Sequence, residues 1–272
     1  MMVNRRIAAR LLLAMVAAAA AHVTAHAQTV AATLTPGQLK IGMEISYPPF
    51  ESYAGNEIVG VDPELARALA KQIGSSASLV DTRFSGLILG LNARHYDAVI
   101  SGMYVTPERV AQARAIPYAQ TGAAILAAAS GTVQPRTMTD LCGLRVAVEQ
   151  GASWAPTLRK VSDGYCKAKG KAEIGIQEFP SAPEALQALL SNNVQAQMEI
   201  AVAAHMLAGK SSGRVVVTST ELIEPQTLGI YVRKDDPTLY DALNKALDQL
   251  KQNGEYGRIL KKYNLLPPAR SS

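Results

Sequence analysis

Short β-favouring segments that lead into helix-start signals recur along this chain, and this repetition limits its fold more than any other feature. Each helix start combines a capping residue with a proline near the first helical position, and most add an acidic residue. They lie at Asp62-Pro63-Glu64, Thr106-Pro107-Glu108, Ser181-Ala182-Pro183-Glu184 and Asp236-Pro237. Strands that alternate with helices are typical of a parallel sheet covered by helices, so the sequence predicts an α/β fold.

The order of the segments predicts two lobes. We expect the chain to cross from the first lobe to the second near residues 123–130, where an apolar run becomes polar, and to return along residues 228–234. A helix-then-strand pattern recurs at residues 87–100 and 186–198, which fits either two similar lobes or ordinary α/β periodicity. The predicted boundaries are residues 28–125 and 228–272 for the first lobe and 126–227 for the second.

The first 27 residues have the three parts of a secretory signal peptide. They are a basic region with three arginines, an apolar run over residues 11–21, and the small-x-small motif Ala25-His26-Ala27. The apolar run is too short to span a bilayer comfortably. We therefore expect export, cleavage near Ala27 and a mature chain that starts near Gln28, with neither a membrane anchor nor a lipid anchor.

The charge balance excludes some classes of function. Three of the 27 basic residues and none of the 22 acidic residues lie in the signal peptide, so 24 basic residues remain against 22 acidic ones. The chain has no basic cluster with interleaved aromatic residues, and we expect no nucleic-acid partner. No metal-ligand spacing, Ser-His-Asp arrangement or phosphate-binding loop is identifiable, so we also expect no cofactor and no metal.

Cys142 and Cys166 are the only two cysteines. An even count in an oxidising compartment favours one disulfide, which closes a loop of about 24 residues. Loop entropy would make its stabilisation on the order of 3 kcal/mol. Two free thiols, or half of a metal site, are the alternatives.

Residues 96–110 predict a strand, a loop and a helix whose first turn contains Arg109. A cation at a helix N-terminus is unfavourable by roughly 0.3–1 kcal/mol, and an anion in front of the helix removes this penalty. The arginine fork and the free backbone donors would together bind one carboxylate. The alternative is a surface salt bridge from Arg109 to an acid such as Glu108 or Asp97.

Several motifs together resemble the solute-binding protein family 3, the periplasmic polar-amino-acid-binding proteins of ABC importers. They are IGMEISYPPFE with IVGVDPELA, YDAVISGMYVTPERV, LRVAVEQGAS, GIYVRKDDP and QNGEYGRILKKY, and they cover nearly all of the mature chain. The resemblance implies the type II periplasmic-binding-protein fold, with a cleft that closes on its ligand between two lobes. It also implies a periplasmic location, a permease in the inner membrane as partner, and a monomer.

The resemblance also assigns roles in the cleft. Arg109 would bind the α-carboxylate of an amino acid, while aromatic side chains enclose the ligand side chain, although core packing is the alternative for these aromatics. The ligand carboxylate would also be bound by the backbone near Ser101, Gly102 and Tyr104 and by the turn Gly151-Ala152-Ser153. The aromatic positions are Tyr47 and Phe84, and the acids at positions linked to ligand choice are Glu44 and Glu149.

One position departs from the family pattern. The family normally has an aspartate that binds the ligand's α-ammonium, but this chain has Ile200 there, directly after Glu199. An unpaired ammonium against isoleucine would be costly. Either Glu199 binds the ammonium, or the ammonium turns toward Glu44, or the ligand has no α-ammonium.

The sequence therefore predicts a non-catalytic receptor for a polar or cationic amino acid or a related small carboxylate. Three acids against one arginine favour a ligand with extra positive charge or amide donors. The alternative is an enzyme that resembles cyclohexadienyl or arogenate dehydratases, in which Glu199 or Glu149 would be a general acid with a raised pKa.

Overall fold

The computed structural model describes residues 33–269, which belong to one compact unit. The signal peptide lies outside the described residues. The main sheet has nine strands, in the order β5-β1-β6-β12-β7-β10-β8-β9, and β11 pairs with β7. The strands are β1 (Gln38–Met43), β5 (Ser76–Asp81), β6 (Ala98–Val99), β7 (Ala113–Ala128), β8 (Arg145–Glu149), β9 (Gly175–Phe179), β10 (Ala196–Ile200), β11 (Val215–Val217) and β12 (Ile223–Arg233).

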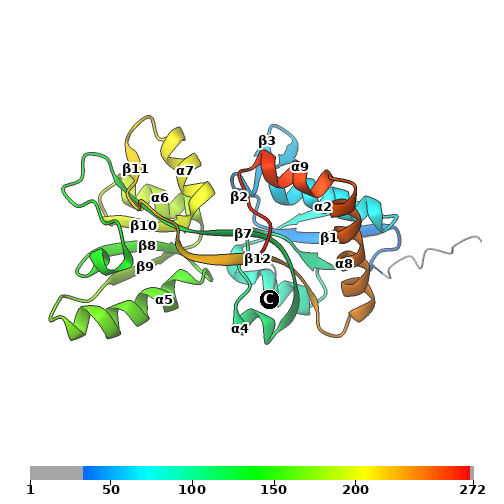
Figure 1. Ribbon diagram of the computed structural model, residues 1–272, viewed down its shortest axis with the longest axis horizontal. Coiled ribbons are helices and arrows are strands. Elements are labelled where there is room, and N and C mark those ends of the chain that lie inside the picture. Colours follow the sequence, from blue (N-terminus) through cyan, green and yellow to red (C-terminus); the bar gives the residue numbers. More distant parts are fainter. Residues whose placement is uncertain (1–32, 270–272) are drawn as a thin grey trace, which may run out of the picture. The chain divides into compact units, whose positions relative to one another are not determined.

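The two longest strands, β7 and β12, run antiparallel to each other through the middle of the sheet (Figure 1). The early part of β7 pairs with the end of β12, and from Ala123 onward β7 pairs with β10 and then β11. The sequence predicts a separate sheet in each lobe, whereas this strand pair joins all nine strands into one. The lobe boundaries themselves stay a prediction.

Parallel pairing on both sides of this strand pair confirms the α/β fold class. β1 pairs in parallel with β5 and β6, and β8 pairs in parallel with β9 and β10. Helices α2, α8 and α9 pack together near β1, while α6 and α7 pack on β8, β10 and β11 (Figure 1). The α-helices are α2 (Val61–Gln72), α3 (Leu87–Asn92), α4 (Pro107–Val110), α5 (Trp154–Val161), α6 (Ala182–Leu190), α7 (Ala201–Lys210), α8 (Pro237–Gln252) and α9 (Glu255–Lys262).

Short helical segments precede or extend several of these helices. A 3-10 turn, η1 (Phe84–Gly86), leads into α3, and a π-helical turn, η3 (Ser162–Cys166), continues α5. A second 3-10 turn is η2 (Met138–Leu141). Among the described residues, no helix is both long and apolar enough to cross a membrane.

Most helix starts agree with the sequence, and one does not. Thr106, Ser181 and Asp236 each accept a hydrogen bond from a first-turn N–H as side-chain caps. Asp62 was expected to cap in the same way, but α2 begins at Val61 with Gly60 at the N-cap. Asp62 lies inside the first turn, where its carboxylate accepts hydrogen bonds from residues of other elements.

The proline-rich segment after β1 forms a small second sheet that the sequence did not predict. Its strands are β2 (Ser46–Tyr47), β3 (Glu51–Ala54) and β4 (Glu57–Val59). The disulfide prediction is confirmed, because Cys142 and Cys166 are bonded with their Cα atoms 5.6 Å apart. The bond joins the end of η2 to the end of η3.

Candidate functional site

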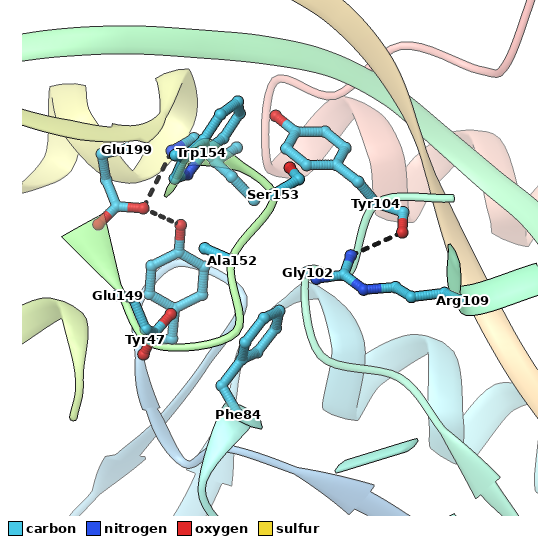
Figure 2. Close-up of a pocket in the computed structure, with 11 residues that line it drawn as sticks. Tyr47, Phe84, Gly102, Tyr104, Arg109, Glu149, Ala152, Ser153, Trp154 and Glu199 are labelled. Atoms are coloured by element: carbon cyan, nitrogen blue, oxygen red, sulfur yellow. Dashed lines mark hydrogen bonds between the residues drawn. The ribbon is translucent and has the colours of Figure 1, made fainter. Parts of the chain in front are cut away.

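A cavity with both charged and aromatic walls lies where β2, η1, α4, β8 and β10 contribute residues near their ends (Figure 2). The volume of this cavity is only about 20 Å³. The lining residues are Tyr47, Phe84, Gly102, Tyr104, Arg109, Glu149, Ala152, Ser153, Trp154, Glu199 and Ile200. The side chains therefore largely fill the cavity and contact one another across it.

Arg109 forms one side of the cavity, where the strand-loop-helix segment places it in the first turn of α4 (Figure 2). Its guanidinium donates to the carbonyl of Tyr104 at 2.7 Å and to the carbonyl of Gly151 at 2.9 Å, and it lies 5.4 Å from the centre of the Phe84 ring. Burial lowers the pKa of this guanidinium from its usual value. Among the described residues Arg109 forms no salt bridge, so the alternative of a surface ion pair with Glu108 or Asp97 is wrong.

Glu199 lies across the cavity from Arg109, at the end of β10 (Figure 2). Its carboxylate accepts hydrogen bonds from the hydroxyl of Tyr47, from Gln197 Nε2 at 3.2 Å and from the backbone N–H of Ile200 at 3.0 Å. Burial raises the pKa of Glu199 to about 7, although these hydrogen bonds oppose the rise. The ionised and protonated forms are therefore both populated near neutral pH.

Two further acids surround Glu199. Glu149, at the end of β8, accepts a hydrogen bond from the N–H of Ala182 at 3.2 Å. Burial and, secondarily, the charge of Glu44 raise the pKa of Glu149 to about 10. Burial also raises the pKa of Glu44, whose carboxylate accepts the N–H of Phe84 and lies 3.9 Å from an exposed guanidinium, that of Arg83. A positively charged group inside the cavity would relieve the repulsion within this group of acids.

Aromatic rings supply the apolar walls. Tyr104 and Trp154 pack edge to face with their ring centres 5.2 Å apart, and Tyr47 stacks on Phe50 at 5.3 Å. The hydroxyls of Tyr104 and Ser153 are buried and have no hydrogen-bond partner. Because buried polar groups are normally paired, these two hydroxyls suit a polar ligand in the cavity.

Apart from Gly151, whose carbonyl accepts from Arg109, the structure brings together ten of the twelve residues that the sequence assigned to ligand binding. The other two, Glu44 and Ser101, adjoin the cavity without lining it. The Ser101 hydroxyl donates to Glu51, and the Gly102 N–H donates to Asp62, so neither donor is free for a ligand carboxylate. Sequence reasoning missed Trp154, although its place directly after the predicted turn at residues 151–153 is a usable signal.

Fold and cavity together define the class of protein, a type II periplasmic-binding-protein fold whose cleft has an arginine on one side and acids on the other. Residues 39–265 match the family of bacterial extracellular solute-binding proteins, family 3. This chain belongs to that family.

Individual relatives agree with this assignment. The chain is 33% identical to the ABC transporter arginine-binding protein 1 of Escherichia coli (strain K12), over 82% of this chain and 88% of that protein. An ancestral arginine-binding protein bound to glutamine superposes with a TM-score of 0.76 at 31% identity, over 84% of this chain and 98% of that one. An ancestral amino-acid-binding protein described as a precursor of cyclohexadienyl dehydratase gives a TM-score of 0.70 at 31% identity, over 84% and 95% of the two chains.

Proposed function

We propose that this protein is the periplasmic receptor of an ABC importer and that it binds a polar or cationic amino acid in the cavity between Arg109 and Glu199. The observation that carries the proposal is the opposition of a partly buried guanidinium and a buried group of acids across one aromatic-walled cavity. An amino acid has the matching pair of charges. The arginine-binding relatives support the cationic end of this ligand range.

In this proposal Arg109 holds the ligand's carboxylate. Its donors now bond to two backbone carbonyls, and a carboxylate would replace the Gly151 carbonyl with a charge-assisted pair. The free hydroxyls of Ser153 and Tyr104 would add further hydrogen bonds.

Glu199 holds the α-ammonium in place of the aspartate that the family has at Ile200. Three observations support this role: Glu199 lines the cavity, Ile200 lines it next to Glu199, and Glu44 does not line it. The ammonium would take the position of the Tyr47 hydroxyl against the carboxylate. Glu149 would then face the ligand side chain and favour a cationic or amide group there.

The remaining parts of the proposal follow from family membership. The mature chain starts near Gln28 in the periplasm, acts as a monomer and delivers its ligand to a permease of the inner membrane. Its two lobes, residues 28–125 with 228–272 and residues 126–227, close on the ligand. The receptor is not an enzyme, and its arginine-binding relatives support this part of the proposal.

A thermal-shift panel tests the proposal, since a ligand that binds the native state raises the melting temperature. We expect stabilisation by arginine, lysine, histidine or glutamine and none by the matching acids without an amine. Arg109→Ala should weaken binding about 30-fold or more, because removing one partner of a desolvated charge pair costs about 2–5 kcal/mol. The matched control is Arg159→Ala, which removes an exposed arginine paired with Glu178.

Two outcomes would contradict the proposal. Stabilisation by amine-free acids alone would remove the role of Glu199, and an Arg109→Ala affinity within threefold of wild type would place the site elsewhere. The enzyme alternative is tested by adding arogenate and measuring the absorbance of an aromatic product. Turnover that disappears in Glu199→Gln would identify a dehydratase instead of a receptor.

A further inference from the structure

Two further acids, separate from the three around the cavity, lie next to the cavity wall at Gly102. Glu51 begins β3 and Asp62 lies in the first turn of α2, and both side chains have no exposed surface. Neither forms a salt bridge with any described residue. Two ionised carboxylates buried side by side without a cation are too costly to persist, so the pair must hold a proton.

The hydrogen bonds show which carboxyl is ionised. Asp62 accepts the N–H of Gly102 at 2.6 Å with one oxygen and the hydroxyl of Tyr118 at 2.7 Å with the other. Its position in the first turn of a helix also favours negative charge. An acid that accepts two donors at a helix N-terminus is the ionised member.

Glu51 has the opposite surroundings. Its Oε1 accepts the hydroxyl of Ser101 at 2.6 Å, while its Oε2 is buried and receives no hydrogen bond. Glu51 and Asp62 are held side by side, because the N–H of Asp62 donates to the carbonyl of Phe50 at 3.1 Å and the two carboxyl groups accept from the consecutive residues Ser101 and Gly102. A hydrogen bond between two carboxyl groups requires a proton. A proton on Oε2 of Glu51, donated to Asp62, satisfies the otherwise unpartnered oxygen.

The charged and titratable groups that face the pair agree with this assignment. They are Tyr118 from β7, which is neutral, and Glu44 from the loop after β1, which is acidic. Burial raises the pKa of Glu51 well above its usual range and that of Asp62 only to about 6. Asp62 therefore loses its proton first as the pH rises.

We infer that Glu51 and Asp62 share one proton carried by Glu51, and that this pair is a positioning element of the binding cleft. It fixes Ser101 through Glu51 and Gly102 through Asp62. Gly102 has a φ of +51°, and a Cβ on it would lie 3.1 Å from the Phe50 ring and 3.2 Å from the Tyr47 ring, so the Gly102 backbone packs against these two stacked rings. Tyr47 in turn donates to Glu199, which links the pair to the ammonium end of the cleft.

Two isosteric variants test the inference. Glu51→Gln keeps an acceptor for Ser101 and a donor for Asp62, so affinity for the amino acid identified in the thermal-shift panel should fall by less than in the matching change at Asp62. Asp62→Asn replaces an acceptor by a donor opposite Gly102 or Tyr118, so the Gly102 backbone should move under the Tyr47 ring and affinity should fall, by up to roughly tenfold if binding has to restore an arrangement that costs one buried hydrogen bond. Asp248→Asn, which changes an exposed aspartate paired with Lys251, is the control.

Infrared spectroscopy at neutral pH supplies a readout that a purely structural role would not change. Protonated Glu149 and Glu199 contribute carboxyl stretches to both proteins, so the difference spectrum of wild type minus Glu51→Gln should contain one further protonated-carboxyl band, that of Glu51. An unchanged spectrum would overturn the proton assignment, and equal affinities for Glu51→Gln and Asp62→Asn would overturn the positioning role. The binding arm rests on the proposed function, but the infrared arm does not, so the two proposals fail separately.

Discussion

At the scale of single residues, Gly151 is a position where the backbone of a neighbouring segment leaves no room for a side chain. Its φ is +82°, and a Cβ on it would lie 2.9 Å from the Cα of Ser85, which belongs to η1. Its carbonyl also accepts from Arg109. Gly151 is therefore the contact through which the turn after β8 approaches the segment around Phe84.

We predict that Gly151→Ala weakens amino-acid binding by about tenfold or more, because the backbone of Ser85 cannot move aside as a flexible side chain could. Titration calorimetry measures the change. Gly254→Ala is the matched control, since Gly254 has the same φ of +82° but nothing within 4 Å of its added Cβ. Equal losses in both variants would mean that backbone strain alone matters.

In the proposed site, Glu199 would make ligand binding dependent on pH. Its pKa is raised to about 7, so it is mostly protonated below that pH and cannot neutralise an ammonium. We predict that affinity falls by up to about tenfold per pH unit below 7 and levels off above it, with proton release on binding near neutral pH. Calorimetry between pH 5.5 and 8.5, in buffers of different ionisation enthalpy, tests both effects. Glu199→Gln should bind more weakly with a flatter profile, and a wild-type affinity that rises in acid would refute the assignment.

Residue chemistry was predictable where it is local. The first-turn position of Arg109 and the step from Glu199 to Ile200 are visible in the sequence, and the structure places all three in the cavity wall. The pair of Glu51 and Asp62 was not predictable, because it joins a strand of the small sheet to a helix and is satisfied by donors from two further segments.

At the scale of elements, the difference between local and long-range interactions explains which helix starts agree with the sequence prediction. The cap and proline of α4, α6 and α8 act within one turn, so these helices begin where the sequence predicts. Asp62 also precedes a proline, but the hydroxyl of Tyr118 and the N–H of Gly102 bind its carboxylate, and α2 begins at Val61. The joining of two predicted sheets through β7 and β12 depends on pairing between strands about a hundred residues apart in sequence, which local patterns do not encode.

The disulfide stabilises the segments around η2 and α5. We predict that replacing Cys142 and Cys166 by alanine lowers the free energy of unfolding by about 3 kcal/mol, because a cross-link across a loop of this length restricts the unfolded chain. The sequence separation of the two cysteines is 24 residues. Urea unfolding of the double variant measures the loss. Neither cysteine lines the cavity, so ligand affinity should not change, and a large loss of affinity without a loss of stability would contradict this prediction.

At the scale of the whole molecule, β7 and β12 are the segments through which the proposed lobes would move. Their pairing is irregular between Ile223 and Gln226 and again between Leu228 and Gly229, close to the crossings expected from the sequence. Bulges of this kind bend strands locally. Hinge motion at these positions would leave the helices and the parallel strands on either side unchanged.

We predict that a saturating amino acid changes the radius of gyration of the wild type, with contraction as the two lobes close. Small-angle scattering with and without ligand measures it, and Arg109→Ala serves as the control that should not respond at the same concentration. An unchanged radius at saturation, with binding confirmed by calorimetry, would reject the hinge for this chain.

The filled cavity has a consequence for selectivity. The hydroxyl of Tyr47 donates a hydrogen bond to Glu199, and the carbonyl of Gly151 accepts one from Arg109. These two groups of the protein therefore stand where the ammonium and the carboxylate of a ligand would bind. A simple amine or a simple acid would displace only one of these internal substitutes and leave the other in place. A zwitterion would displace both at once. The receptor would therefore bind molecules that carry an ammonium and a carboxylate together, and would bind singly charged metabolites only weakly.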